Sequence, residues 1–226
     1  MKNKFLSAVL IFGALAVGAA GNASAHALWI EKGKDGSAAI FFGEYGEGLR
    51  EKTGGKLDEI AHMEAWSISV DGQKTALTPS KTEDRFVLDA KGADVLVQDV
   101  SLPVKDMQKY KLGIAKPHLY ARVAGGLSTD LKPELRLDIV LSKENPGKVR
   151  VYFDGKPLAK EKAVWIAPNG WMKELKTDEE GWLKAEQPWP GVYVMEVTHV
   201  VETPGKFDGK DYEVERHRMT LSLEKA

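Results

Sequence analysis

The sequence contains no cysteine among its 226 residues. This absence excludes thiolate metal sites, disulfide frameworks, cysteine nucleophiles and iron–sulfur clusters. An excess of one charge is also missing, because 32 Lys and Arg residues stand against 33 Asp and Glu residues, for a formal net charge of −1. Without a basic block, binding to nucleic acid or to an anionic membrane is not expected. Any chemistry must therefore use His, carboxylates, Met, Tyr, hydroxyl groups or the backbone.

The first 25 residues have the pattern of a secretory signal peptide. Lys2 and Lys4 form a positive start, residues 5–20 are apolar, and Ala23-Ser24-Ala25 is an A-x-A cleavage signal. The apolar stretch is short for a membrane span and ends in small residues, so we expect cleavage rather than a retained anchor. No other long uncharged apolar stretch follows. The pattern predicts export through the Sec route to the periplasm, with no insertion into a membrane after processing.

Cleavage after Ala25 would make His26 the first residue of the mature chain. A free α-amine has a pKa of roughly 8 and can lose its proton near neutral pH. His26 would then offer two nitrogen ligands, its amine and its imidazole Nδ1, and a second imidazole would complete the arrangement of a copper histidine brace. Nitrogen ligands in a plane favour Cu(II), with Ni(II) as the next candidate. The alternative is that a histidine follows the cleavage site by coincidence.

Short segments rich in β-branched and aromatic residues, bounded by turn residues, run through the rest of the chain. Helical periodicity is weak, and residues 51–63 could hold one short helix. The pattern predicts an all-β fold of two β-sandwich halves, Ig-like or prealbumin-like. The polar residues 142–147 predict a boundary, with an N-terminal β-sandwich region over 26–143 and a second β-sandwich over 146–226. The expected strands are 38–42, 65–70, 85–88, 94–97, 148–153, 164–167, 177–183, 192–201 and 212–223.

The second region carries motifs that resemble a known module. The segments KVRVYFDGKPLAKEKAVWIAP and TDEEGWLKAEQPWPGVYVMEVTH are similar to a carboxypeptidase-regulatory-like, prealbumin-like sandwich. With the N-terminal HALWIEK and the tail TPGKFDGKDYEVERHRMTLSL, residues 26–223 resemble a periplasmic family of unknown function whose members are labelled NikM-like components of nickel or cobalt uptake. The resemblance implies a nickel or cobalt ion as ligand and a metal transporter of the inner or outer membrane as partner.

Two histidines lie on strands that we expect to form one hairpin. Side chains alternate along a strand, which places His199 and His217 on apolar faces. If the hairpin turns at residues 206–209, paired residue numbers sum to about 416 and His199 lies opposite His217. Two imidazoles at that spacing could share one metal ion. The alternative is a pair of packed histidines that are hydrogen-bonded to a carboxylate such as Glu196 or Glu215.

Other ring nitrogens and the thioethers are secondary candidates. His118 lies in Lys116-Pro117-His118-Leu119-Tyr120, expected as an exposed loop or the start of a strand, and is kept as a further metal ligand. His62 is in phase with apolar neighbours, which favours packing at an edge strand. Met195 and Met219 flank the paired histidines, and thioether sulfur suits Cu(I), although core filling is the more frequent role of Met. Whether His62 or the methionines join the site is left open.

Two further sets of side chains are notable. Five carboxylates in a Gly-rich segment could orient imidazoles or bind a hard cation, although the EF-hand spacing is missing and a solvated loop is the default. Three tryptophans could form an exposed patch for a sugar or protein partner. The two sets are Glu44, Glu47, Glu51, Asp58 and Glu59, and Trp171, Trp182 and Trp189.

These features predict a periplasmic transition-metal-binding protein that buffers copper, nickel or cobalt, or delivers the ion to an uptake system. The expected ligands are His26, His199, His217 and His118, and affinity should fall below pH ~6 as imidazoles protonate. The sequence has no G-x-S-x-G, H-E-x-x-H or phosphate-binding motif, so no enzyme activity and no catalytic residue are expected. The alternative is a structural or interaction β-sandwich module of the cell envelope, which binds no stoichiometric metal.

Overall fold

The computed structural model describes residues 26–226, except residues 70, 92, 125–131, 143 and 146. The predicted signal peptide, residues 1–25, therefore lies outside the described residues. The described helices are three 3-10 turns, η1 (Tyr45–Glu47), η2 (Lys56–Glu59) and η3 (Gln108–Tyr110). Each of these turns is far too short to cross a membrane. The predicted all-β class is confirmed, and the helix predicted within 51–63 is limited to the single turn η2.

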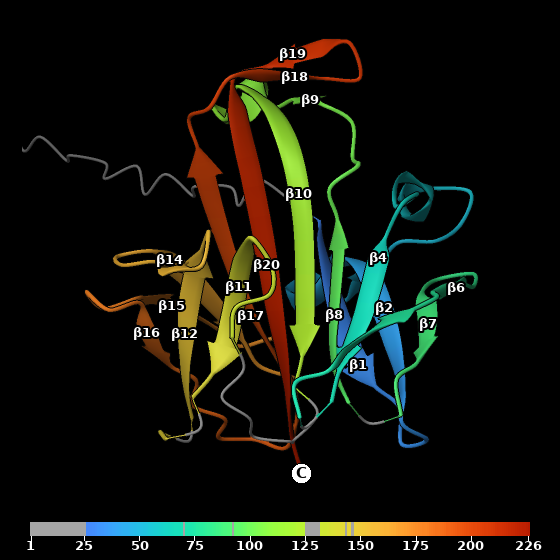
Figure 1. Ribbon diagram of the computed structural model, residues 1–226, viewed down its shortest axis with the longest axis vertical. Helices are drawn as coiled ribbons and strands as arrows, with labels where there is room; N and C mark the ends of the chain where they lie inside the picture. Colours follow the sequence, from blue (N-terminus) through green and yellow to red (C-terminus); the bar gives the residue numbers. More distant parts are fainter. Residues whose placement is uncertain (1–25, 70, 92, 125–131, 143, 146) are drawn as a thin grey trace, which may run out of the picture.

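A nine-stranded sheet forms the centre of the molecule (Figure 1). Its strands follow the order β15-β14-β17-β20-β10-β8-β4-β5, and β9 also pairs with β10. Both predicted regions contribute strands to this sheet. The bounds are β4 (Glu64–Ile68), β5 (Lys74–Leu77), β8 (Asp94–Asp99), β9 (Lys105–Asp106), β10 (Ile114–Val123), β14 (Lys162–Ile166), β15 (Met172–Lys176), β17 (Gly191–Val201) and β20 (Val214–Lys225).

Two smaller sheets pack on opposite faces of the central sheet. Side chains alternate along β10, so Leu119 and Ala121 join one core while Tyr120 joins the other. The result is three β-layers with two apolar cores between them. The first outer sheet holds β1 (Ala27–Lys32), β2 (Ser37–Glu44), β3 (Leu49–Arg50), β6 (Ser80–Lys81) and β7 (Phe86–Asp89); the second holds β11 (Leu137–Leu141), β12 (Lys148–Phe153), β13 (Lys156–Pro157) and β16 (Trp182–Lys184); β18 (Gly205–Phe207) and β19 (Lys210–Tyr212) form a separate hairpin.

The predicted boundary at residues 142–147 connects two paired strands. β11 lies before it and β12 after it, and the antiparallel register sets Leu141 opposite Val149. In addition, β10 of the first predicted region pairs with β20 of the second. Regions 26–143 and 146–226 therefore share two sheets, and the chain does not divide into separate sandwiches at this point.

Pro117 lies inside β10, although proline has no N–H to donate to a neighbouring strand. β9 pairs with β10 at Ile114 and Ala115, and β8 pairs with it from Leu119 onward. Pro117 therefore falls in the gap between these two partners, where the strand has an open side and proline is tolerated. The next residue, His118, therefore lies inside β10, whereas the sequence pattern predicted an exposed loop or the start of a strand at this position.

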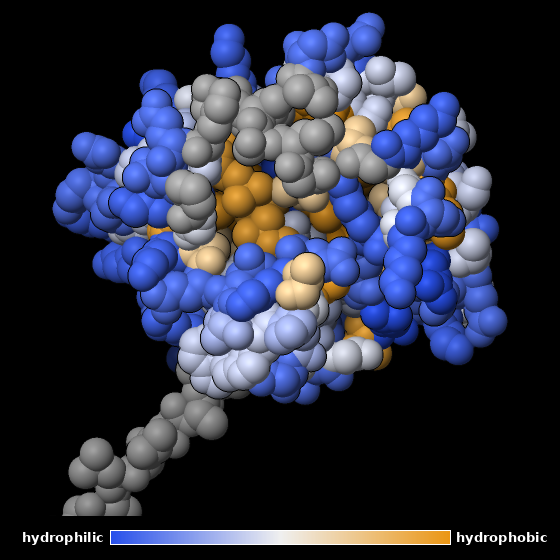
Figure 2. Space-filling view, turned by 90° about the horizontal axis from the view of Figure 1, so that it is seen from below, coloured by the Kyte–Doolittle hydropathy of each residue, from blue (hydrophilic) through white to orange (hydrophobic). Residues whose placement is uncertain are grey.

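The end of the molecule that carries the C-terminus has a hollow with apolar walls. Seen from below, apolar side chains gather there inside a hydrophilic border (Figure 2). A cavity of about 460 Å³ at this end is lined by residues that include Ile30, Val123, Leu141 and Leu223, which lie at or near the ends of their strands. The hollow marks where the two apolar cores approach the surface.

Candidate metal centre

Three histidines form one row across the central sheet, on β17, β20 and β10. His199 lies opposite His217, and His217 lies beside His118 in the parallel pair of β10 and β20. The predicted opposition of His199 and His217 is confirmed. These positions share a face with Tyr120 and Met219, which belong to the core beneath the second outer sheet.

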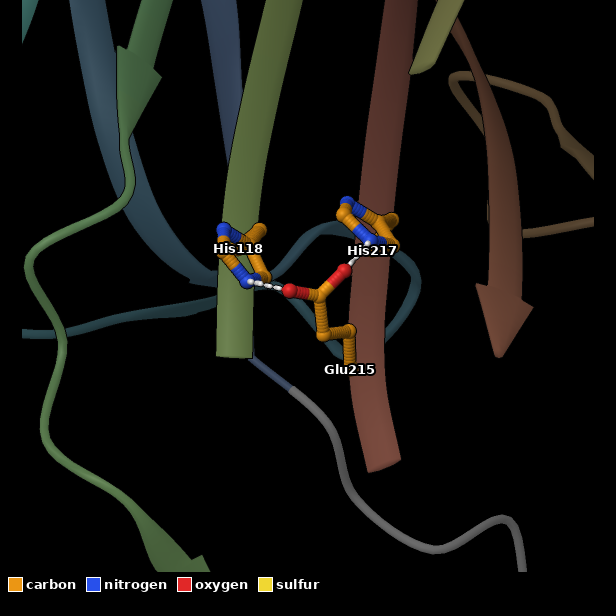
Figure 3. Close-up of side chains that lie close together, drawn as sticks. All are labelled: His118, Glu215 and His217. Atoms are coloured by element: carbon orange, nitrogen blue, oxygen red, sulfur yellow. Dashed lines mark hydrogen bonds and ion pairs between the residues drawn. The ribbon is translucent and has the colours of Figure 1, made fainter. Parts of the chain in front are cut away.

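His118, Glu215 and His217 converge on one point (Figure 3). Nε2 of His217 is 3.3 Å from Oε2 of Glu215, and Nε2 of His118 is 4.0 Å from Oε1. One potential ligand atom from each residue lies within 4.8 Å of the other two, and within the described chain this is the one such group. Ligands about 2.1 Å from a tetrahedral ion are about 3.4 Å apart. The His217–Glu215 spacing already matches that value, whereas the other spacings within the cluster, which reach up to 4.8 Å, would have to shorten around an ion.

Burial keeps both imidazoles of this cluster neutral. His217 is fully buried, the side chain of His118 is 13% exposed, and the two rings stack with centroids 4.5 Å apart. Burial, assisted by the neighbouring His217, lowers the pKa of His118 to about 3. Burial and the charge of Arg136 lower the pKa of His217 to about 4. Because a metal ion competes with protons for ring nitrogens, imidazoles that are neutral at pH 7 are ready ligands.

Glu215 is the charged member of the cluster. Burial by itself would raise the pKa of Glu215, but the hydrogen bond and charge of Arg136 outweigh it, and the net shift is downward. Nη1 of Arg136 donates to Oε2 of Glu215 at 2.7 Å, and the Tyr212 hydroxyl donates to Oε1 at 3.4 Å. Nε of Arg136 donates to Asp154 at 3.0 Å. The carboxylate therefore carries a negative charge, and the guanidinium occupies one of its oxygens.

Tyr120 forms a hydrogen bond with Nδ1 of His217, the ring nitrogen that faces away from Glu215. Its hydroxyl lies 3.0 Å from Nδ1 of His217. In the neutral ring, Nε2 donates to Glu215 while Nδ1 accepts from the hydroxyl. If an ion took Nε2, the ring proton would sit on Nδ1 and donate to the Tyr120 oxygen, an outer hydrogen bond typical of histidine ligands. Nε2 of His118 is buried and has no hydrogen-bond partner among the described residues, and in the tautomer with the proton on Nδ1 its lone pair would be free for an ion.

His199 is held outside this cluster by two neighbours. Its Nδ1 lies 2.6 Å from Oε2 of Glu161. The Phe153 ring packs 4.6 Å from the His199 ring and 5.1 Å from the His217 ring. The aromatic ring of β12 thus contacts both histidines. His199 fits the alternative of a histidine bonded to a carboxylate, although the carboxylate comes from a residue that the sequence did not single out.

His26 is surrounded by charged side chains. Its Nε2 contacts Glu51, its Nδ1 lies 3.6 Å from Glu44, and Nζ of Lys56 lies 3.1 Å from Nε2. Two of the five predicted carboxylates therefore do contact an imidazole. The ammonium group of Lys56 is therefore a direct neighbour of Nε2.

The central sheet separates His26 from the histidine row. His26 lines a cavity together with Leu119, whose side chain points to the opposite face of β10 from that of His118. The structure therefore does not bring His26 together with His118, His199 or His217, and one ion cannot bridge the two faces. The shared brace expected from the sequence is corrected to a cluster that excludes His26.

The remaining candidates do not join the cluster. Met195 and Met219 are fully buried in the apolar core, as expected for gap-filling residues. His62 is exposed in the loop after η2, where its backbone N–H bonds Asp99. His118, expected near a surface loop, lies within β10 and is mostly buried.

The predicted tryptophan patch is partly present. Trp171 and Trp189 are exposed, and their rings meet edge to face with centroids 6.0 Å apart. Trp182 is partly buried and lies under the guanidinium of Arg150 at 4.9 Å.

Comparison with models of known protein families gives no match for this chain, and comparison with curated proteins gives none. The function is therefore argued from the geometry of the cluster.

Proposed function

We propose that the protein is a periplasmic transition-metal-binding protein that holds a copper, nickel or cobalt ion at His118, Glu215 and His217. The observation that carries the proposal is the convergence of two neutral imidazole nitrogens and one ionised carboxylate. Imidazole ligands suit copper and nickel, and a carboxylate adds charge compensation. Three protein ligands leave coordination positions open. An ion held in this way can be exchanged, which suits buffering or delivery to an uptake transporter and requires no reaction.

The direct test is calorimetric titration of the protein with Cu(II), Ni(II) and Co(II). We expect one ion per chain at the cluster, and about 100-fold or greater weakening in His118→Gln, since even outer partners of metal ligands contribute 10–100-fold. His62→Gln removes an exposed histidine outside the cluster and is the matched control, with unchanged affinity. Equal affinities for wild type and His118→Gln would contradict the proposal. Fe(II) belongs in the same panel because two histidines and one carboxylate also bind non-haem iron.

A second titration separates the cluster from the predicted N-terminal brace. Protein that begins at His26 is compared with the same protein carrying one extra residue before it. If the cluster is the site, both bind with equal affinity, because His26 lies across the sheet. A loss of the principal binding event in the extended protein would assign the ion to the α-amine and contradict the proposal.

The buried imidazoles also predict the pH dependence of binding. The pKa values of His118 and His217 are lowered to about 3 and about 4, whereas unfolded-chain histidines titrate near 6.5. We therefore expect metal affinity to stay nearly constant from pH 7 to 5 and to fall below about pH 4, lower than ordinary imidazoles would require. Below about pH 6.5 these two histidines bind more protons in the unfolded chain than in the folded chain, so their contribution to the free energy of unfolding decreases as the pH falls. Competition titrations at pH 7, 6 and 5 measure the first effect, and a steady loss of affinity from pH 6.5 downward would argue against it.

A further inference from the structure

A second hollow lies on the opposite face of β10 and β20 from the histidine cluster. Its volume is about 300 Å³, at the lower end of the range for small-molecule sites. One part of its wall is apolar and comes from β2, β10 and the segment after β8. The apolar lining includes Phe42, Leu102, Pro117 and Leu119, and the polar lining comprises His26, Lys56, Lys105, Lys109 and Arg216, with Glu59 and Asp106 as the acidic residues.

Several charges around this cavity already have partners, but Arg216 does not. Nζ of Lys105 lies 2.5 Å from Glu59, and Asp106 accepts the backbone N–H of Gln108 at 2.9 Å. The Arg216 guanidinium makes no hydrogen bond or ion pair with any described residue, its Nε is fully enclosed, and Glu196 acts on it only as a more distant charge. A guanidinium with an enclosed donor and no acceptor is costly to bury. The Arg216 side chain therefore lines the cavity without an acceptor of its own, next to apolar side chains.

The neighbours of Arg216 do not supply the missing acceptor. Arg218 lies two residues along on the same face of β20, and its Nη2 donates to Glu196 at 2.8 Å, so this carboxylate is already paired. Burial and the charge of Arg218 lower the pKa of Arg216 to about 10, so the guanidinium is still charged at neutral pH. Lys109 at the rim adds a second cation, and its Nζ lies 4.6 Å from the centre of the Tyr110 ring.

We propose that this cavity binds a small organic carboxylate with an apolar or aromatic body of about the size of benzoate. The carboxylate would accept hydrogen bonds from Arg216, whose planar fork matches its two oxygens. The body of the ligand would lie against Phe42, Leu102 and Leu119. An inorganic anion would leave that apolar wall unfilled. The site is separate from the metal cluster, because Arg216 points to the other face of the strand from Glu215 and His217.

The test uses benzoate and its neutral analogue benzamide, with binding measured by calorimetry and by the melting temperature. We expect benzoate to bind and raise the melting temperature, and benzamide to bind at least tenfold more weakly. Arg216→Gln should weaken benzoate binding at least tenfold, while Arg150→Gln, an arginine of β12 in the second outer sheet, should leave it unchanged. Equal binding of benzoate and benzamide, or wild-type affinity in Arg216→Gln, would overturn the proposal.

Two further variants keep the test decisive. If Arg216→Gln does not fold, Lys109→Glu at the exposed rim should still reduce benzoate affinity several-fold, and wild-type affinity in that variant would count against the site. His118→Gln should bind benzoate like the wild type. His118→Gln therefore tests the metal site and Arg216→Gln tests the carboxylate site, so a failure of one proposal can be distinguished from a failure of the other.

Discussion

Arg122→Met should lower the free energy of unfolding by about 3–5 kcal/mol, the cost of leaving a buried charge without its partner. Arg122 on β10 and Asp138 on β11 are both fully buried. Nε and Nη2 of the guanidinium donate to the two carboxylate oxygens at 3.0 and 2.6 Å. Asp138 also accepts the backbone N–H groups of Glu134 and Ile139 at 2.8 and 2.9 Å. The pair therefore connects the central sheet to the second outer sheet.

Urea unfolding measures this effect, with two comparisons. The double variant Arg122→Met with Asp138→Leu removes both charges, and we expect it to be clearly more stable than Arg122→Met alone, because no unpaired carboxylate remains. Arg85→Met removes an arginine whose side chain is 39% exposed and paired with Asp84, and we expect a loss of at most about 1 kcal/mol. A loss for Arg122→Met no larger than that for Arg85→Met would show that the buried pair contributes little.

Two substitutions around Glu215 should change metal affinity in opposite directions. Glu215→Gln removes the only charged ligand of the cluster, and we expect about 10–100-fold weaker binding. Arg136→Gln removes the cation that lies 2.7 Å from the same carboxylate. Because like charges repel and the guanidinium occupies one ligand oxygen, we expect about tenfold tighter binding in Arg136→Gln. Such opposite shifts are not expected if the cluster is only a structural hydrogen-bond network.

Isothermal titration with Cu(II) or Ni(II) at constant ionic strength compares the two variants. Arg85→Gln removes a guanidinium that is paired with Asp84, outside the cluster, and serves as the control for a change in net charge. Metal affinity that rises equally in Arg136→Gln and Arg85→Gln would reflect overall charge alone. Unchanged affinity in both Glu215→Gln and Arg136→Gln would place the ion elsewhere.

The hairpin of β17 and β20 shows what the local sequence pattern can predict and what it cannot. The turn at Asp208-Gly209 and the alternation of apolar residues together predict that His199 opposes His217, and the register has this pairing. Glu215 and His217 are two residues apart, so their shared face was also visible in the sequence. By contrast, the segment 142–147 has the composition of a linker but joins two paired strands of one sheet, β11 and β12. Composition alone cannot distinguish these two roles, because both need polar residues that favour turns.

The sequence by itself determined the all-β class, several strands such as β8, β12 and β17, the absence of thiol chemistry and the local register that sets His199 opposite His217. Only the tertiary structure decided which side chains meet. Parallel strands need a long connection, so no local pattern places His118 beside His217 across the β10–β20 pair. The same packing sets Phe153 and Glu161 against His199 and puts His26 on the other face of the sheet. Local periodicity assigns a residue to a face of its own strand, whereas neighbours from distant segments are chosen by the burial of whole faces against one another.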